Sequence, residues 1–170
     1  KDAMNEARRM AAHLKSLNFP PQSNIALFSK NSAWWIMADL AIWMAGHVSV
    51  PLFPTLADHT IKQILEHSES KLIFVGKLDG FEAMQPGIPT DLPTIALPLS
   101  PKTDYDKWEN IISKTEPITE DVQRDPDEMA TIVYTSGSTG KPKGVMLGFG
   151  RMALCVSAVQ KLIPIDKNDR

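Results

Sequence analysis

The chain has 170 residues, of which 43% are hydrophobic and 22% are charged, and its formal net charge is −2. This length is sufficient for one domain with a hydrophobic core, and the composition is typical of a soluble globular protein. The slightly acidic balance gives no electrostatic basis for binding nucleic acid or an anionic membrane.

Neither a disulfide nor a transmembrane segment is expected. Cys155 is the single cysteine, which excludes an internal disulfide and fits a reducing compartment. We expect its side chain to be buried on a helix as a small hydrophobic group. The most apolar run, residues 33–48, is too short to span a bilayer and contains Asp39. No signal-peptide pattern is found.

The first half of the chain alternates between helix and strand patterns. Apolar residues at helical spacing form a stripe that ends before Pro20-Pro21, namely Met4, Ala7, Ala11, Leu14 and Leu17. Two further helices are predicted: an apolar one over residues 32–45, which Gly46 ends, and one that Thr55 or Asp58 caps and that runs to about His67. Strands are predicted at residues 25–28, 48–53 and 71–75.

The second half begins with a looser segment. Residues 76–101 contain five prolines, and only residues 94–97 have the pattern of a strand. The later predicted elements are a short helix at 105–113, a buried strand at 129–135, a strand at 145–147, and a helix from about Arg151 to Leu162. This alternation predicts an α/β fold with a doubly wound, mostly parallel sheet flanked by helices.

The segment that follows the strand at 129–135 carries most of the functional information. Its ten residues, 135–144, contain four hydroxyl side chains, three glycines and two lysines. Glycine allows φ > 0 and a close approach of the backbone, and successive N–H groups can form an anion-binding concavity. Hydroxyls can bind phosphate oxygens or magnesium, and lysines supply positive charge. The segment therefore predicts a polyphosphate-binding loop, formed by Thr135, Ser136, Gly137, Ser138, Thr139, Gly140, Lys141, Lys143 and Gly144.

Two well-known phosphate loops do not fit this segment. A Walker A motif requires glycine at position 135 and serine or threonine at position 142, where Thr135 and Pro142 stand, and this disfavours a GTPase-like hydrolase. The dinucleotide pattern also requires glycine at position 135. Pro142 and Gly144 oppose a following helix, so the loop is predicted to join two strands, with no helix dipole in the site. The alternative interpretation is a surface hairpin rich in turn residues.

Residues 134–145, which read Tyr-Thr-Ser-Gly-Ser-Thr-Gly-Lys-Pro-Lys-Gly-Val, resemble the signature loop of the adenylate-forming enzymes. That family includes acyl-CoA synthetases, firefly-type luciferases and the adenylation domains of peptide synthetases. The similarity extends to shorter patterns at residues 31–35, 41–52, 67–71 and 125–131. It covers most of residues 4–75 and 125–147, with a poorly matched middle.

The resemblance implies a reaction in two halves. A carboxylate attacks the α-phosphate of ATP, which gives an acyl-adenylate and pyrophosphate, and a thiol, usually that of coenzyme A, then attacks the acyl group. The expected small molecules are a carboxylic acid, ATP, Mg²⁺ and coenzyme A. By the same resemblance Lys143 is the catalytic residue that neutralises charge, and Thr135 lies near the magnesium ion. The implied phosphate contacts come from Ser136, Gly137, Ser138, Thr139 and Gly140, with a lesser one from Lys141.

The resemblance also sets expectations for domain organisation and substrate. Residues 1–170 would be a partial N-terminal nucleotide-binding domain with its phosphate loop at 134–145. The remainder of the large domain and the C-terminal lid would be absent, so this piece alone should be inactive. Residues 31–54 and the Tyr-Thr-Ser-Gly-Ser-Thr-Gly form of residues 134–140 look most like those of long-chain fatty acyl-CoA synthetases. An aryl-CoA ligase, a carrier-protein ligase and a non-catalytic polyphosphate-binding module remain alternatives. A cytoplasmic location is expected, and a peripheral membrane contact and the oligomeric state stay open.

Other conspicuous residues have structural interpretations. The tryptophans and methionines of residues 34–44 fit a buried helix better than an acyl pocket. The four histidines lack metal-ligand spacing and are expected at the surface or as satisfied core residues. The carboxylates of residues 125–128 fit a solvated turn, and residues 50–54 fit a structural role. Phe149 stands where many family members have histidine, and it either lines an acyl tunnel or packs against the core.

Overall fold

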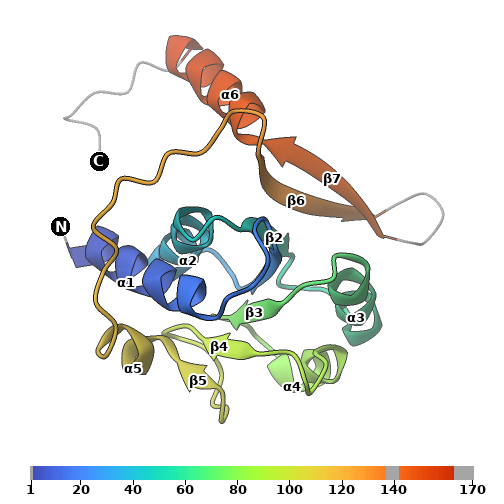
Figure 1. The fold of residues 1–170 in the computed structure, drawn as a ribbon. Helices are drawn as coiled ribbons and strands as arrows, with labels where there is room; N and C mark the ends of the chain where they lie inside the picture. Colours follow the sequence, from blue (N-terminus) through green and yellow to red (C-terminus); the bar gives the residue numbers. More distant parts are fainter. Residues whose placement is uncertain (1, 137–141, 163–170) are drawn as a thin grey trace.

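The computed structural model describes residues 2–136 and 142–162, and these form one seven-stranded sheet (Figure 1). The strands run in the order β5-β4-β3-β1-β2-β6-β7. All neighbours are parallel except β6 and β7, which are antiparallel. The predicted α/β fold with a mostly parallel sheet is therefore confirmed. The strands are β1 (Asn24–Phe28), β2 (Val48–Leu52), β3 (Leu72–Val75), β4 (Thr94–Ala96), β5 (Asp106–Lys107), β6 (Met129–Ser136) and β7 (Pro142–Gly148).

Side chains of the central strands alternate between two hydrophobic cores. In β1, Ile25 and Leu27 belong to the first core, whereas Ala26 and Phe28 belong to the second, and all four are fully buried. The residues of β3 alternate in the same way. Because successive side chains of a strand point to opposite faces, an apolar run without a polar position has to be covered on both sides. The short apolar runs of the sequence thus specify a doubly wound sheet.

Helices cover both faces of this sheet (Figure 1). The first core is completed by α1 (Asp2–Ser16), α2 (Ala33–Met44) and the short α5 (Trp108–Ile112). The second is completed by α3 (Asp58–His67) and α4 (Phe81–Met84), which the 3-10 turn η1 (Gln85–Gly87) follows. The last helix, α6 (Phe149–Leu162), comes directly after β7. The predicted stripe of α1 is buried as expected at Ala7, Ala11 and Leu14, while Met4 at its start is exposed.

The start of α3 differs from the prediction. Ser32 caps α2 through its hydroxyl, the usual arrangement for this residue type. The prediction that Thr55 or Asp58 caps α3 is wrong, because Ala57 occupies the cap position and offers no side-chain acceptor. Asp58 is instead the first helical residue, and its carboxylate accepts a hydrogen bond from the His59 amide at 2.7 Å. A negative charge in the first turn is favourable there because it faces the positive end of the helix dipole.

Three short elements have no counterpart in the sequence prediction. The turn elements α4 and η1 lie within the proline-rich segment at 76–101. The two residues of β5 occupy the start of the predicted helix at 105–113, so that α5 begins only at Trp108. Elements of two to four residues are too short to establish a hydrophobic period, and tertiary pairing decides their conformation.

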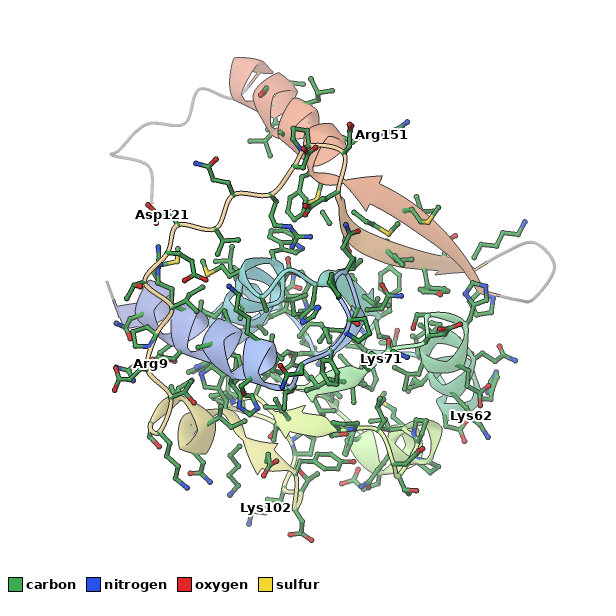
Figure 2. The ribbon with its side chains drawn as sticks, in the orientation of Figure 1. Arg9, Lys62, Lys71, Lys102, Asp121 and Arg151 are labelled. Atoms are coloured by element: carbon green, nitrogen blue, oxygen red, sulfur yellow. The ribbon has the colours of Figure 1, made fainter. Side chains whose placement is uncertain are left out.

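A long connection carries the chain from α5 past α1 to β6 (Figures 1 and 2). Arg8 of α1 binds it at three points. The guanidinium donates to the carbonyl oxygens of Ile118 at 3.1 Å and of Glu120 at 3.0 Å, and to the carboxylate of Asp121 at 2.9 Å. These bonds satisfy backbone groups that no regular element would satisfy. The connection is thus held against α1 although it has little secondary structure.

The predicted burial of Cys155 is wrong. Cys155 is exposed on α6, and its neighbours Leu154 and Val156 are 72% and 56% exposed. The helical pattern of this segment was predicted, but a pattern does not say which neighbour covers the helix. In the part of the chain that the structure describes, none of the helices has the length and hydropathy of a membrane span.

Asp39 of α2 is a carboxyl group in a largely apolar setting. Burial raises its pKa from 3.8 to about 6. The folded protein therefore holds the proton of Asp39 more tightly than the unfolded chain does. The contribution of Asp39 to the free energy of unfolding should fall as the pH rises from about 4 to about 6, and it should stay low above that range.

Asp39→Asn is expected to raise the free energy of unfolding by about 2 kcal/mol near neutral pH, because asparagine mimics the protonated carboxyl group. Near pH ~4 the variant should gain much less. Urea denaturation at both pH values measures the difference. The exposed Asp91 provides the matched control, since Asp91→Asn should change the stability by less than about 0.5 kcal/mol. A gain for Asp39→Asn that is equal at both pH values contradicts the prediction.

Candidate functional site

The predicted phosphate loop connects β6 and β7, which form an antiparallel hairpin at one edge of the sheet. The prediction that this loop joins two strands is confirmed, and the second strand is longer than the predicted 145–147. Because β6 is parallel to β2 and β2 to β1, the carboxyl ends of these three strands lie at the same end of the sheet. Open parallel α/β sheets bind their ligands at the carboxyl ends of their strands.

Cavities lie beside the carboxyl ends of β1, β2 and β6. The chain leaves β1 toward α2 on one face and leaves β2 toward α3 on the other, and such a change of face opens a crevice. A cavity of about 170 Å³ lies there, lined in part by Asn31 and Val133. A larger cavity of about 370 Å³ lies between the end of β2, α3 and the hairpin, and its lining includes Ile64, Tyr134 and Thr135. The base of the phosphate loop therefore borders a mainly apolar cavity.

The structure brings together two of the predicted site residues. Thr135 of β6 and Lys143 of β7 are direct partners across the hairpin, and both are exposed. Ser136 pairs with Pro142 one step further along. The stem of the hairpin thus presents a hydroxyl and an ammonium group side by side. The other predicted residues, Gly137, Ser138, Thr139, Gly140 and Lys141, lie outside the described residues.

Gly144 serves a different purpose from the one predicted first. It is not among the glycines with positive φ and lies in the regular strand β7. A Cβ atom at this position would lie 2.8 Å from Cγ2 of Ile132 and 3.3 Å from Cζ of Tyr134. The side chains of Ile132 and Tyr134 fill the space that a Cβ atom would need, and this explains the glycine at position 144.

Tyr134 connects the hairpin to α3. Its side chain is 4% exposed and belongs to the second core. A hydrogen bond of 2.7 Å joins its hydroxyl to Nδ1 of His67, and the two rings meet edge to face with centroids 5.7 Å apart. Burial raises the pKa of the Tyr134 hydroxyl, so it stays protonated under ordinary conditions. This contact was not predicted from the sequence.

The other end of the hairpin is held by Arg124. Its Nη1 donates to the carbonyl oxygens of Trp43 at 2.8 Å and of His47 at 3.4 Å, and its Nε donates to the carboxylate of Glu128. The guanidinium carbon lies 4.9 Å from the ring centre of Phe149, and this ring also packs edge to face on Trp43 at 5.5 Å. The structure shows Phe149 in a packing role, which is one of the two roles that the sequence left open. The role of Arg124 was not predicted from the sequence.

The histidines and carboxylates form no metal site among the described residues. Asp125 and Asp127 are exposed, and the Asp125 carboxylate accepts a hydrogen bond from the Asp127 amide at 2.9 Å, which confirms the predicted solvated turn for these two residues. Glu128 differs, because its half-buried carboxylate binds Arg124. His47 differs from its prediction as a satisfied core residue. It is 3% exposed, its Nδ1 has no hydrogen-bond partner in the described part of the chain, and burial lowers its pKa, helped by the charge of Arg124.

These features define a class of protein: a doubly wound α/β domain with an antiparallel hairpin that carries a hydroxyl and a lysine side chain near the carboxyl ends of the parallel strands. The chain belongs to the AMP-binding enzyme family, whose sequence profile matches residues 1–170.

Individual relatives differ in what their names describe. The chain is 31% identical to the nonribosomal peptide synthetase ecdA of Aspergillus rugulosus over 92% of its own length and 2% of that protein. It is 33% identical to fatty acyl-CoA synthetase A of Dictyostelium discoideum over 86% of its length and 24% of that protein. A benzoate CoA ligase from Burkholderia xenovorans superposes with a TM-score of 0.81 at 20% identity, over 98% of this chain and 32% of the ligase. The chain thus spans less than a third of each of these proteins.

Proposed function

We propose that the protein is an AMP-forming ligase that activates a carboxylic acid with ATP and transfers the acyl group to coenzyme A. Family membership supports the nucleotide part of this proposal. The main structural support for the proposal is the pairing of Thr135 with Lys143 at the base of the loop. Residues 1–170 would contribute the N-terminal part of the nucleotide-binding domain, and the rest of the large domain and a C-terminal lid would complete the active site.

The first half-reaction has to bring two anions together. A carboxylate oxygen attacks the α-phosphorus while the bond to the pyrophosphate oxygen breaks, so negative charge accumulates on the leaving group. An ammonium group held near that charge lowers the barrier because its position costs no reorganisation during the reaction. We assign this role to Lys143 and phosphate contacts to Ser136, Gly137, Ser138, Thr139, Gly140 and Lys141.

Magnesium fits the same stem. Mg²⁺ is usually held by one or two protein oxygens together with phosphate oxygens and water, and the exposed hydroxyl of Thr135 can supply such an oxygen. When bound, the ion would neutralise charge on the β- and γ-phosphates. The hydroxyl of Thr135 would hold it in place.

The choice of acid is proposed from similarity. We favour a long-chain fatty acid, because residues 31–54 resemble those of long-chain acyl-CoA synthetases and a fatty acyl-CoA synthetase is among the relatives. An aryl-CoA ligase or a carrier-protein ligase is the alternative, since a benzoate CoA ligase and a nonribosomal peptide synthetase are similar too. A cytoplasmic location and a peripheral membrane contact stay predictions.

Lys143→Ala in the complete protein tests the catalytic proposal. Loss of one charge-stabilising donor should slow acid-dependent exchange of pyrophosphate into ATP by about 100-fold. The assay uses a series of fatty acids of increasing length, benzoate and amino acids, so the preferred acid appears in the same experiment. Lys62→Ala is the matched control, because Lys62 is exposed on α3 and its ammonium projects from the outside of that helix (Figure 2).

The outcomes separate the alternatives. Unchanged exchange in Lys143→Ala refutes the role of Lys143. A wild-type protein that binds ATP but supports no exchange with any acid indicates the non-catalytic polyphosphate-binding module.

A further inference from the structure

The hairpin extends beyond the part of the sheet that supports it. The ladder between β2 and β6 holds one residue pair, Ser49 with Thr131, near the start of β6. The later residues of β6 pair only with β7, which is itself the edge strand of the described sheet. Figure 1 shows the hairpin running outward in the direction of α3. The backbone ladder therefore does not set the position of the stem, and side chains have to do so.

Tyr134 is the side chain that supports the stem. Its ring is buried in the second core, while its chain neighbour Thr135 is exposed. This alternation places the phenol toward α3 and the site hydroxyl toward solvent. Directly across the hairpin, Gly144 leaves the space that the ring needs, because a Cβ atom there would lie 3.3 Å from Cζ of Tyr134. The ring is thus enclosed between β7 and α3.

His67 fixes the far end of this ring. It is the last residue of α3, and its Nδ1 lies 2.7 Å from the Tyr134 hydroxyl. The end of α3 is itself attached to the centre of the sheet, because the Asn24 amide group donates to the carbonyl oxygen of Ser68 at 2.6 Å. Ile64 packs in the second core one turn earlier. Hydrogen bonds and core contacts therefore connect β1 through α3 to the stem of the hairpin.

We propose that His67 is a positioning residue for the site: through Tyr134 it sets where Thr135 and Lys143 stand relative to the bound triphosphate. This inference rests on the proposed function of the hairpin. His67 contacts the hairpin through Tyr134, so we expect it to act on the site through that residue. Its hydrogen bond holds in either ring tautomer, because the phenol can donate or accept. Small displacements of groups that hold a substrate reduce binding and rate, so loss of the bond should be visible in ATP affinity.

The test uses the full-length protein and its dissociation constant for ATP with magnesium, measured by calorimetry. His67→Ala and Tyr134→Phe should each weaken ATP binding by about fivefold, because part of the binding free energy would then be needed to order the stem that one net hydrogen bond had held in place. The double variant should be no weaker than either single one, because both changes remove the same bond. His67→Gln should restore most of the affinity, since glutamine can again bond to the phenol.

His59→Ala is the matched control, because His59 lies on the same helix with its side chain 71% exposed. It should bind ATP like the wild type. The inference is wrong if His67→Ala also binds like the wild type, or if the two single effects multiply in the double variant. Should His67→Ala fail to fold, Tyr134→Phe decides, because it removes a single oxygen atom. A wild-type protein that does not bind ATP rejects the proposed function itself, which is a different result.

Discussion

Trp108→Ala is expected to lower the free energy of unfolding by about 3–5 kcal/mol, which is the usual cost of removing a large buried aromatic side chain. Trp108 is fully buried at the start of α5 and packs against Phe74 with ring centres 6.1 Å apart. Its indole Nε1 also donates to the Glu6 carboxylate of α1 at 3.1 Å. The side chain therefore joins α5, α1 and the sheet in one contact region. Chemical denaturation followed by circular dichroism measures the loss.

Two further variants separate packing from hydrogen bonding at this position. Trp108→Phe keeps an aromatic ring but removes the N–H donor and part of the volume, so it should cost about 1–2 kcal/mol. Trp34→Ala on α2 is the control, because that indole is only partly buried at the margin of the same core. It should cost about 1 kcal/mol. If Trp108→Ala costs no more than Trp34→Ala, α5 is not part of the core that stabilises the domain.

The architecture was predictable because the strands of this sheet are short apolar runs. Residues 25–28 include no polar residue, so the side chains on both faces of this strand have to be buried. The helices that alternate with the strands can bury both faces only in a doubly wound arrangement. The stem of the site was predictable for a related reason. Pro142 and Gly144 oppose a helix, and the second strand is what remains.

The supports of the site were not predictable from one sequence. His67 and Tyr134 are 67 positions apart, and nothing in either local pattern says that α3 ends beside β6. The exposure of Cys155 has a similar origin, because the amphipathic period predicts α6 but not its neighbours. Gly144 is an intermediate case: the sequence predicts that glycine matters there, but only the structure shows that the side chains of Ile132 and Tyr134 fill the space beside it.

Arg124→Ala is expected to lower the free energy of unfolding by about 2–4 kcal/mol, because several partners lose their donor at once. The side chain is 10% exposed and serves the carbonyl oxygens of Trp43 and His47 together with the Glu128 carboxylate. Buried acceptors left without a donor cost more than the net value of the bonds themselves. The ring of Phe149 would also lose its stacked cation. Urea denaturation of the variant measures the change.

The loss should be concentrated at the hairpin. Arg124 precedes β6 and contacts both the C-terminal end of α2 and the first residue of α6, directly after β7. Hydrogen exchange in the variant should therefore accelerate in β6, β7 and the start of α6, and much less in β1 and β3. Arg124→Lys keeps the charge but not the planar fork that reaches several acceptors, and it should recover about half of the loss. Arg151→Ala is the control, because Arg151 is exposed on α6 (Figure 2), and it should change the stability by less than about 0.5 kcal/mol. Equal effects of Arg124→Ala and Arg151→Ala would show that the hairpin depends on its own pairing and on the His67–Tyr134 contact alone.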